Sequence, residues 1–235
     1  EVHKVVGKLY LSVDQLDLKQ LGKILDDNDA LRKAIQINYG SFLDEGERNN
    51  RSAYPLLQET TGPKSSGKMH NKFLVRGNTV LTGSPNYTES GLHRNIEVLI
   101  KIENNPLIAS FFRQYFHIIR DTTGDKLKTE GPALANALTR FNAISENKIK
   151  IALAPLISIS KFIETELQGR NTIIVRMFLI SLKGGDKPEA GGIVEFLGTL
   201  ASQKKAHVTV VVDQSQYNAS ENDFVKEAVR YLLSF

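Results

Sequence analysis

The chain has 235 residues, 41% of them hydrophobic, which is enough to bury a core but too short for two large domains. It contains no cysteine, which excludes a disulfide framework and thiolate metal ligands, and no apolar run approaches the ~20 residues of a membrane span. A net charge of +4 with a pI near 9.1 fits a solvated surface of mixed charge better than the clustered basic surface of a nucleic-acid binder. None of these features indicates a cellular compartment.

Strand and helix patterns alternate along the first half, which is typical of α/β layers. The predicted elements are strands at 5–11 and 34–39, a helix at 52–59, and a hairpin of strands at 70–75 and 79–81. The segment 95–102 alternates, with isoleucine and valine on one side and Glu97 on the other, so it is predicted to be a strand.

A long helix is predicted to begin at Asn105-Pro106, an N-cap residue followed by a proline in the first turn. Its hydrophobic residues recur at helical spacing and are expected to face a core: Leu107, Ile108, Phe111, Phe112, Tyr115, Phe116 and Ile119. The sequence Thr-Thr-Gly-Asp at 122–125 interrupts the pattern. We therefore place a domain boundary between residues 1–124 and 125–235.

The second half repeats the theme. Strands are predicted at 148–153, 172–180 and 208–212, and helices at 158–167, after a turn at 184–192, and at 222–233. The order of strand, polar loop and helix after residue 34 resembles the order after residue 208. We interpret the second half as a divergent copy of the first, the alternative being that two α/β segments share a rhythm.

His70 and Lys72 form the most informative pair in the chain. Side chains at alternate positions of an extended strand share a face, so an imidazole and an ammonium are expected side by side. Such a pair suits phosphate chemistry, because the imidazole can attack phosphorus or move a proton near neutral pH while the lysine neutralises phosphate oxygens. The turn Gly83-Ser84-Pro85-Asn86 and the carboxylate of Glu97 follow.

His-x-Lys on a strand, followed by Gly-Ser-x-Asn, resembles the signature of the phospholipase D superfamily. The resemblance implies an α/β fold of phospholipase D-like lobes, with a mixed, mostly parallel β-sheet flanked by helices and two pseudo-repeated halves. Residues 1–124 would be the lobe with the motif, and 125–235 a second, incomplete lobe. One position departs from the pattern, because Gly77 stands where the superfamily has an aspartate.

The resemblance also implies roles for the site residues. His70 would form a phosphohistidine intermediate, or act as the acid if a partner histidine attacks, and Lys72 would hold the phosphoryl oxygens. Ser84 and Asn86 would donate hydrogen bonds to the phosphate, and Glu97 would hydrogen-bond the histidine. The implied chemistry needs no metal or other cofactor. Three further acidic residues are interpreted as a solvated loop rather than a metal site: Asp44, Glu45 and Glu47.

The reaction of this superfamily needs two facing histidines, so one motif is half a site. None of the other histidines is followed by a lysine two positions later: His3, His93, His117 and His207. Either the chain pairs with a second copy as a homodimer, or a second motif lies just beyond residue 235. The apparent internal repeat favours the second possibility.

Three functions remain open at this point. The first is a phosphodiesterase acting on a phospholipid, which the two-lobed pattern favours. The second is a nuclease of the same mechanism, which the pI and the aromatic turn Gly-Ser-Pro-Asn-Tyr at 83–87 support. The third is a non-catalytic binding or scaffolding protein, suggested by Gly77 and the single motif.

Overall fold

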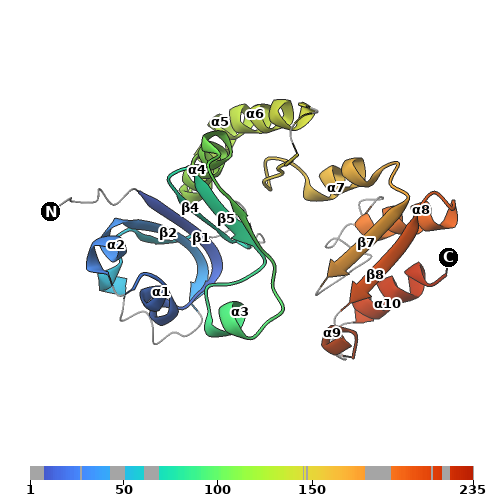
Figure 1. Ribbon diagram of the computed structural model, residues 1–235, viewed down its shortest axis with the longest axis horizontal. Coiled ribbons are helices and arrows are strands. Elements are labelled where there is room, and N and C mark those ends of the chain that lie inside the picture. Colours follow the sequence, from blue (N-terminus) through green and yellow to red (C-terminus); the bar gives the residue numbers. More distant parts are fainter. Residues whose placement is uncertain are drawn as a thin grey trace. The chain divides into compact units, whose positions relative to one another are not determined.

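The computed structural model describes residues 8–26, 28–42, 51–60, 69–144, 146, 148–177, 192–212, 214–218 and 223–234. The chain forms two compact units, Glu1–Ile151 and Ala152–Phe235 (Figure 1). The boundary lies later than the one we predicted after residue 124. Helices α5 (Asp125–Thr129) and α6 (Gly131–Ala143) pack with α4 (Pro106–Arg120), so the break at 122–125 separates helices within one unit.

The first unit is built on a six-stranded sheet. Its strands, in spatial order, are β3 (Leu57–Glu59), β2 (Ile35–Phe42), β1 (Leu9–Leu16), β4 (Phe73–Arg76), β5 (Thr79–Gly83) and β6 (Leu99–Ile102). The predicted mixed α/β architecture is confirmed. Parallel pairing is confined to β1, β2 and β3, whereas β4 runs antiparallel to both β1 and β5, and β5 antiparallel to β6.

Local sequence explains where several elements begin and end. Asp17 caps α1 (Leu18–Ile24) by accepting a hydrogen bond from the Gln20 backbone at 2.8 Å. Asn105 caps α4 in the same way through the Ile108 backbone at 3.0 Å, as predicted. Between β4 and β5 the chain reverses at Gly77, whose φ of +56° lies in the left-handed region that suits glycine in a two-residue hairpin turn.

Each face of this sheet is covered by a different helix. One face buries Leu11, Val13 and Ile37 with Leu21 of α1. On the other face, Phe116 of α4 lies edge-on to Tyr10 with ring centroids 5.2 Å apart, and Phe112 packs on Phe73 in the same way at 5.1 Å. The predicted apolar stripe of α4 therefore faces the core, except that Leu107 is 51% exposed.

Two predicted elements are wrong. The helix at 52–59 is replaced by a short 3₁₀ turn at 51–53 and by β3, because Pro55 breaks the helical run and backbone pairing with β2 takes over. The strand at 148–153 does not form. Instead, the amide side chain of Asn142 bonds both backbone groups of Ile151, at 2.8 Å to its N–H and 2.7 Å to its carbonyl.

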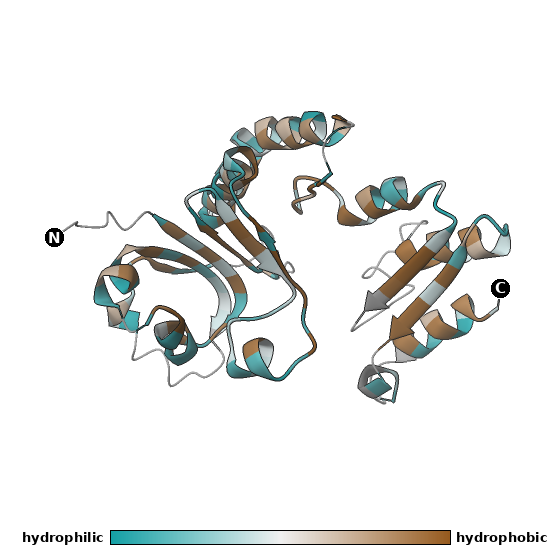
Figure 2. Cartoon of the chain, in the orientation of Figure 1, coloured by the Kyte–Doolittle hydropathy of each residue, from teal (hydrophilic) through white to brown (hydrophobic). Residues whose placement is uncertain are grey.

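The second unit contains α7 (Ile159–Leu167), β7 (Thr172–Met177), α8 (Ile193–Ser202), β8 (His207–Val212), α9 (Gln214–Asn218) and α10 (Asp223–Leu232). Strands β7 and β8 are parallel and rich in hydrophobic residues (Figure 2). Helices α8 and α10 contact each other and pack on the face that carries Val210. The opposite face leaves Ile174 74% exposed and Val211 45% exposed. The internal repeat stays a prediction.

Several short helices and the longer α6 were not predicted from the sequence; the short ones are α1, α2 (Asp29–Ala34), α3 (Glu89–His93), α5 and α9. The predicted turn at 184–192 lies outside the described residues, apart from its last position. Among the helices that the structure describes, none combines the length and the apolar character needed to cross a membrane.

Tyr115 gives the first unit a testable dependence on pH. Burial raises the pKa of its hydroxyl from 10.0 to about 12. Above the ordinary pKa the unfolded chain loses this proton while the folded chain keeps it, so stability falls as pH rises from 10.0 towards about 12. The unfolding free energy of the wild type should fall between roughly pH 9 and pH 11. In Tyr115→Phe this fall should be smaller by about 1 kcal/mol, as measured by urea unfolding.

Asn71→Ala is the matched control, because Asn71 donates to the Tyr115 hydroxyl at 2.8 Å. This variant loses the hydrogen bond but keeps the phenol, so its stability should still fall between the two pH values. An identical pH dependence in Tyr115→Phe and the wild type would contradict the prediction.

Candidate active site

His70 and Lys72 lie directly before β4, whose first residue, Phe73, pairs with Ser12 near the middle of β1. The Lys72 side chain is 5% exposed, and the His70 side chain is 75% exposed. The Lys72 ammonium lies 3.1 Å from Nδ1 of His70 and donates to the His70 carbonyl oxygen at 3.1 Å. The structure thus places the two side chains together, although both precede the strand on which we predicted them.

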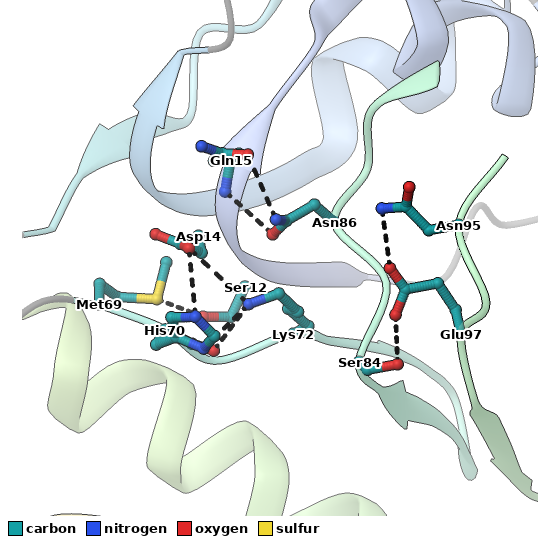
Figure 3. Close-up of polar contacts among 10 residues, drawn as sticks. All are labelled: Ser12, Asp14, Gln15, Met69, His70, Lys72, Ser84, Asn86, Asn95 and Glu97. Carbon is teal, nitrogen blue, oxygen red and sulfur yellow. Dashed lines mark hydrogen bonds and ion pairs between the residues drawn. The ribbon is translucent and has the colours of Figure 1, made fainter. Parts of the chain in front are cut away.

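Asp14 completes this group and was missed from the sequence. Its Oδ2 lies 3.6 Å from Nε2 of His70 and 3.8 Å from the Lys72 ammonium (Figure 3). Gly40 on the neighbouring strand makes room for it, because a Cβ there would lie 3.1 Å from Oδ1 of Asp14 and 2.9 Å from its carbonyl oxygen. The available signal was a carboxylate near the carboxyl end of the first predicted strand, but nothing local connects it to the motif.

The turn after β5 is held by the end of β1. Asn86 accepts from the Gln15 backbone at 3.2 Å and donates to the Gln15 side chain at 3.4 Å. The backbone N–H of Asp17 donates to the carbonyl of Tyr87 at 3.1 Å. This turn therefore has a fixed position relative to Asp14, the residue before Gln15.

Ser84 and Glu97 form a second polar group (Figure 3). One oxygen of Glu97 accepts a hydrogen bond from the Ser84 hydroxyl, and the other accepts from Asn95 at 3.2 Å. The Ser84 hydroxyl in turn accepts from the Val98 backbone at 3.0 Å. The structure corrects the expectation that Glu97 hydrogen-bonds His70. Glu97 bonds Ser84 and Asn95 instead, and the carboxylate that contacts His70 is that of Asp14.

Comparison with known proteins finds a family match for part of the chain. Residues 20–119 match the family described as "Cardiolipin synthase, PLD-like domain", and this range includes every site residue named above except Asp14, Gln15 and Asp17. This part of the chain is therefore a phospholipase D-like domain.

Two solved structures are similar to about half of the chain at low sequence identity. NucT from Helicobacter pylori matches with a TM-score of 0.41 and 14% identity, covering 49% of this chain and 79% of that one. Nuc from Salmonella typhimurium, titled a phospholipase D family member, matches with a TM-score of 0.34 and 17% identity over the same shares. No curated protein matches the chain.

Gly77, which replaces the aspartate of the phospholipase D pattern, lies away from this site. It sits in the hairpin turn at the opposite end of β4 from Lys72, and its carbonyl accepts a hydrogen bond from Arg113 at 2.6 Å. A Cβ at this position would meet nothing within 4 Å. The departure therefore removes no contact from the His70–Lys72 pair, and it gives little reason to regard the site as degenerate.

Burial lowers the pKa of Lys72. Loss of water lowers the pKa of its ammonium from 10.5, and the Coulomb attraction of Asp14, followed by that of Glu97, opposes this effect. An ammonium with little hydration and nearby carboxylates is a strong partner for a phosphoryl oxygen.

The structure offers no alternative metal centre within its described part, where no three histidine, cysteine or acidic side chains gather closely enough to hold an ion. The acidic residues Asp44, Glu45 and Glu47, which we interpreted as a solvated loop, lie outside the described residues.

Gly91 provides a test of how the turn at 83–86 is positioned. A Cβ on this buried glycine of α3 would lie 2.4 Å from the Asn86 carbonyl oxygen and 2.9 Å from its nitrogen, so the backbone would have to move. We expect Gly91→Ala to lower the unfolding free energy by about 1–3 kcal/mol and to shift the Asn86 and Gln15 amide resonances.

Ser90→Ala is the control, since Ser90 is exposed on the same helix. Its unfolding free energy should stay within about 0.5 kcal/mol of the wild type. Equal effects of the two substitutions would show that the close approach of Gly91 to Asn86 does not hold the turn.

Proposed function

We propose that the protein is a phosphodiesterase that cleaves a phosphodiester through a phosphohistidine intermediate, with a phospholipid as the favoured substrate. The observation that carries the proposal is the contact between the accessible imidazole of His70 and the buried ammonium of Lys72. The match of residues 20–119 to a phospholipase D-like domain supports phosphodiesterase activity in general. The site residues and the substrate are our assignment.

In the proposed reaction, a ring nitrogen of His70 attacks phosphorus. The new N–P bond replaces the bond to the leaving oxygen, which departs with a proton from a second acid. Water then attacks the phosphorus of the phosphohistidine and gives a proton to the group that protonated the leaving oxygen. The N–P bond breaks, which releases the phosphate product and restores the imidazole. Lys72 donates to the phosphoryl oxygens, on which negative charge increases in both transition states.

The turn that carries Ser84 and Asn86 would supply further hydrogen bonds. An amide nitrogen has two hydrogens, so the bond from Asn86 to Gln15 leaves a second hydrogen for a phosphoryl oxygen. Ser84 already donates to Glu97, so in this proposal it acts by fixing the turn unless substrate displaces that bond. Glu97 acts on Lys72 through its charge rather than on His70 through a hydrogen bond.

Two observations favour a lipid over a nucleic acid. Apolar side chains flank Glu97, where Ile96 is 81% and Val98 65% exposed, and Ile100 in β6 is 52% exposed. The acyl part of a lipid therefore has a surface to contact. Tyr87, the aromatic residue of the turn, is only 8% exposed and so offers no face for stacking on a base. The matched family is itself named after cardiolipin synthase.

The first functional prediction concerns metal and His70. Hydrolysis of bis-p-nitrophenyl phosphate should survive EDTA, because the nucleophile and the phosphate clamp are side chains. His70→Ala should lower the rate by at least about 10³-fold, since the covalent route is closed. His93→Ala, at the exposed end of α3, is the matched control and should keep the wild-type rate.

The same protein should release headgroup from phospholipid vesicles faster than it cleaves a single-stranded oligonucleotide. Activity that EDTA abolishes and added magnesium or zinc restores would contradict the mechanism. Preferred cleavage of the oligonucleotide would keep the mechanism and replace the lipid by a nucleic acid. An inactive protein that still binds both substrates would favour a scaffolding role.

The second functional prediction concerns the acid. We infer that a second histidine must protonate the leaving oxygen. Where no second motif is present, a second copy of the chain supplies this histidine. We also infer that the second unit is a divergent lobe. General acid catalysis typically contributes roughly 10²–10⁴-fold. Activity per chain should therefore rise with protein concentration as copies associate, and an excess of the His70→Ala chain should inhibit the wild type.

Analytical ultracentrifugation over the same concentration range checks the association directly. A strictly monomeric chain with constant, full activity per molecule would contradict the half-site argument.

A further inference from the structure

Asp14 carries an inference about which phosphate the site accepts. It lies outside residues 20–119, the part that matches the phospholipase D-like family, yet its Oδ2 is within 4 Å of both His70 and Lys72. Its side chain is 22% exposed and is seated against Gly40, on the strand beside its own. A negative charge is thus built into the position where an anionic substrate must bind.

Distance makes this charge relevant to any bound phosphate. An oxygen hydrogen-bonded to the Lys72 ammonium lies about 2.7–3.2 Å from it. Because Asp14 Oδ2 is 3.8 Å from the same ammonium, that oxygen lies at most about 7 Å from the carboxylate. This is shorter than the Debye length of about 8 Å at physiological ionic strength, so salt screens the repulsion only in part.

The charge balance of the group disfavours a dianion. Asp14 and Glu97 both act on the Lys72 ammonium, and the imidazole of His70 adds at most one positive charge. These four side chains therefore carry no net positive charge in either state of His70. When His70 is protonated, the group has no net charge, so a singly charged diester binds through its hydrogen bonds without net repulsion. A second negative charge on the phosphate is repelled by the two carboxylates, and the group has no further cation to offset it.

We propose that Asp14 is a specificity-determining residue that makes the site favour singly charged phosphodiesters over doubly charged phosphomonoesters. The inference rests on the proposed function, because it places the substrate phosphate at His70 and Lys72. The negative charge of Asp14 would also weaken the binding of phosphomonoesters to the site, including that of the reaction product where the product is a phosphomonoester.

The test uses binding, so it does not depend on turnover. Dimethyl phosphate and methyl phosphate are titrated into the full chain at about pH 8, where a phosphomonoester with a second pKa near 6 carries two charges. Binding is followed by calorimetry and by the His70 ring resonances. Asp14→Asn removes the charge at nearly constant size, and Asp14→Glu keeps it.

Glu103→Gln is the control for overall charge, because Glu103 lies just past the end of β6 and pairs with Lys101 at 2.7 Å, outside this group. We expect wild type, Asp14→Glu and Glu103→Gln to prefer dimethyl phosphate. In Asp14→Asn the preference should fall on the order of tenfold, as expected for one unit charge several ångströms away near a partly exposed surface. If Asp14→Asn does not fold by circular dichroism, Asp14→Ser carries the same test.

Other results separate this proposal from the proposed function. If Asp14→Asn binds both anions with the wild-type ratio, Asp14 does not set specificity, whether or not the enzyme cleaves diesters. If the wild type binds neither anion, both proposals fail together. If the ratio falls as expected but His70→Ala leaves hydrolysis unchanged, the charge selection stands and the phosphohistidine mechanism does not.

Discussion

The antiparallel pairing of β4 with β1 is the constraint on which the rest of the site depends. It sets Ser12 opposite Phe73, and so brings the segment before β4 beside the last residues of β1. The histidine and lysine of the motif then meet Asp14, while Gln15 reaches across to Asn86. A shift of one residue in this register would turn every side chain of β4 to the other face and separate these groups.

Burial of Lys72 links stability to binding. A side chain that is 5% exposed has lost most of its water, and the fold compensates with the carboxylates of Asp14 and Glu97 rather than with a close salt bridge. A tight ion pair would satisfy the ammonium but would also occupy the position of a substrate oxygen. The ammonium has three donors, of which two face His70, so at 3.8 Å from Asp14 it keeps one donor for the ligand that we propose.

The sequence predicted those features that local pattern determines. The hairpin of β4 and β5, the cap and apolar face of α4, and the closeness of His70 and Lys72 all follow from neighbouring residues. Asp14 could not be found in this way, because its partner is set by strand pairing. Contacts between distant residues also explain two other differences. The helix predicted at 52–59 does not form, because pairing of β3 with β2 outweighs local spacing. The boundary lies later than predicted, because α6 packs Phe141 on Phe111 of α4.

The position of β6 has a consequence for handling the protein. It is the last strand of the described sheet, so one row of its backbone hydrogen-bonding groups lacks a strand neighbour there, and the residues around it include the exposed Ile96, Val98 and Ile100. A free edge with apolar side chains is a template on which another chain can add a strand. In a concentrated preparation of the first unit alone, self-association should nucleate here, and the unit would need detergent, a covering partner or a charged residue on this edge to stay dispersed.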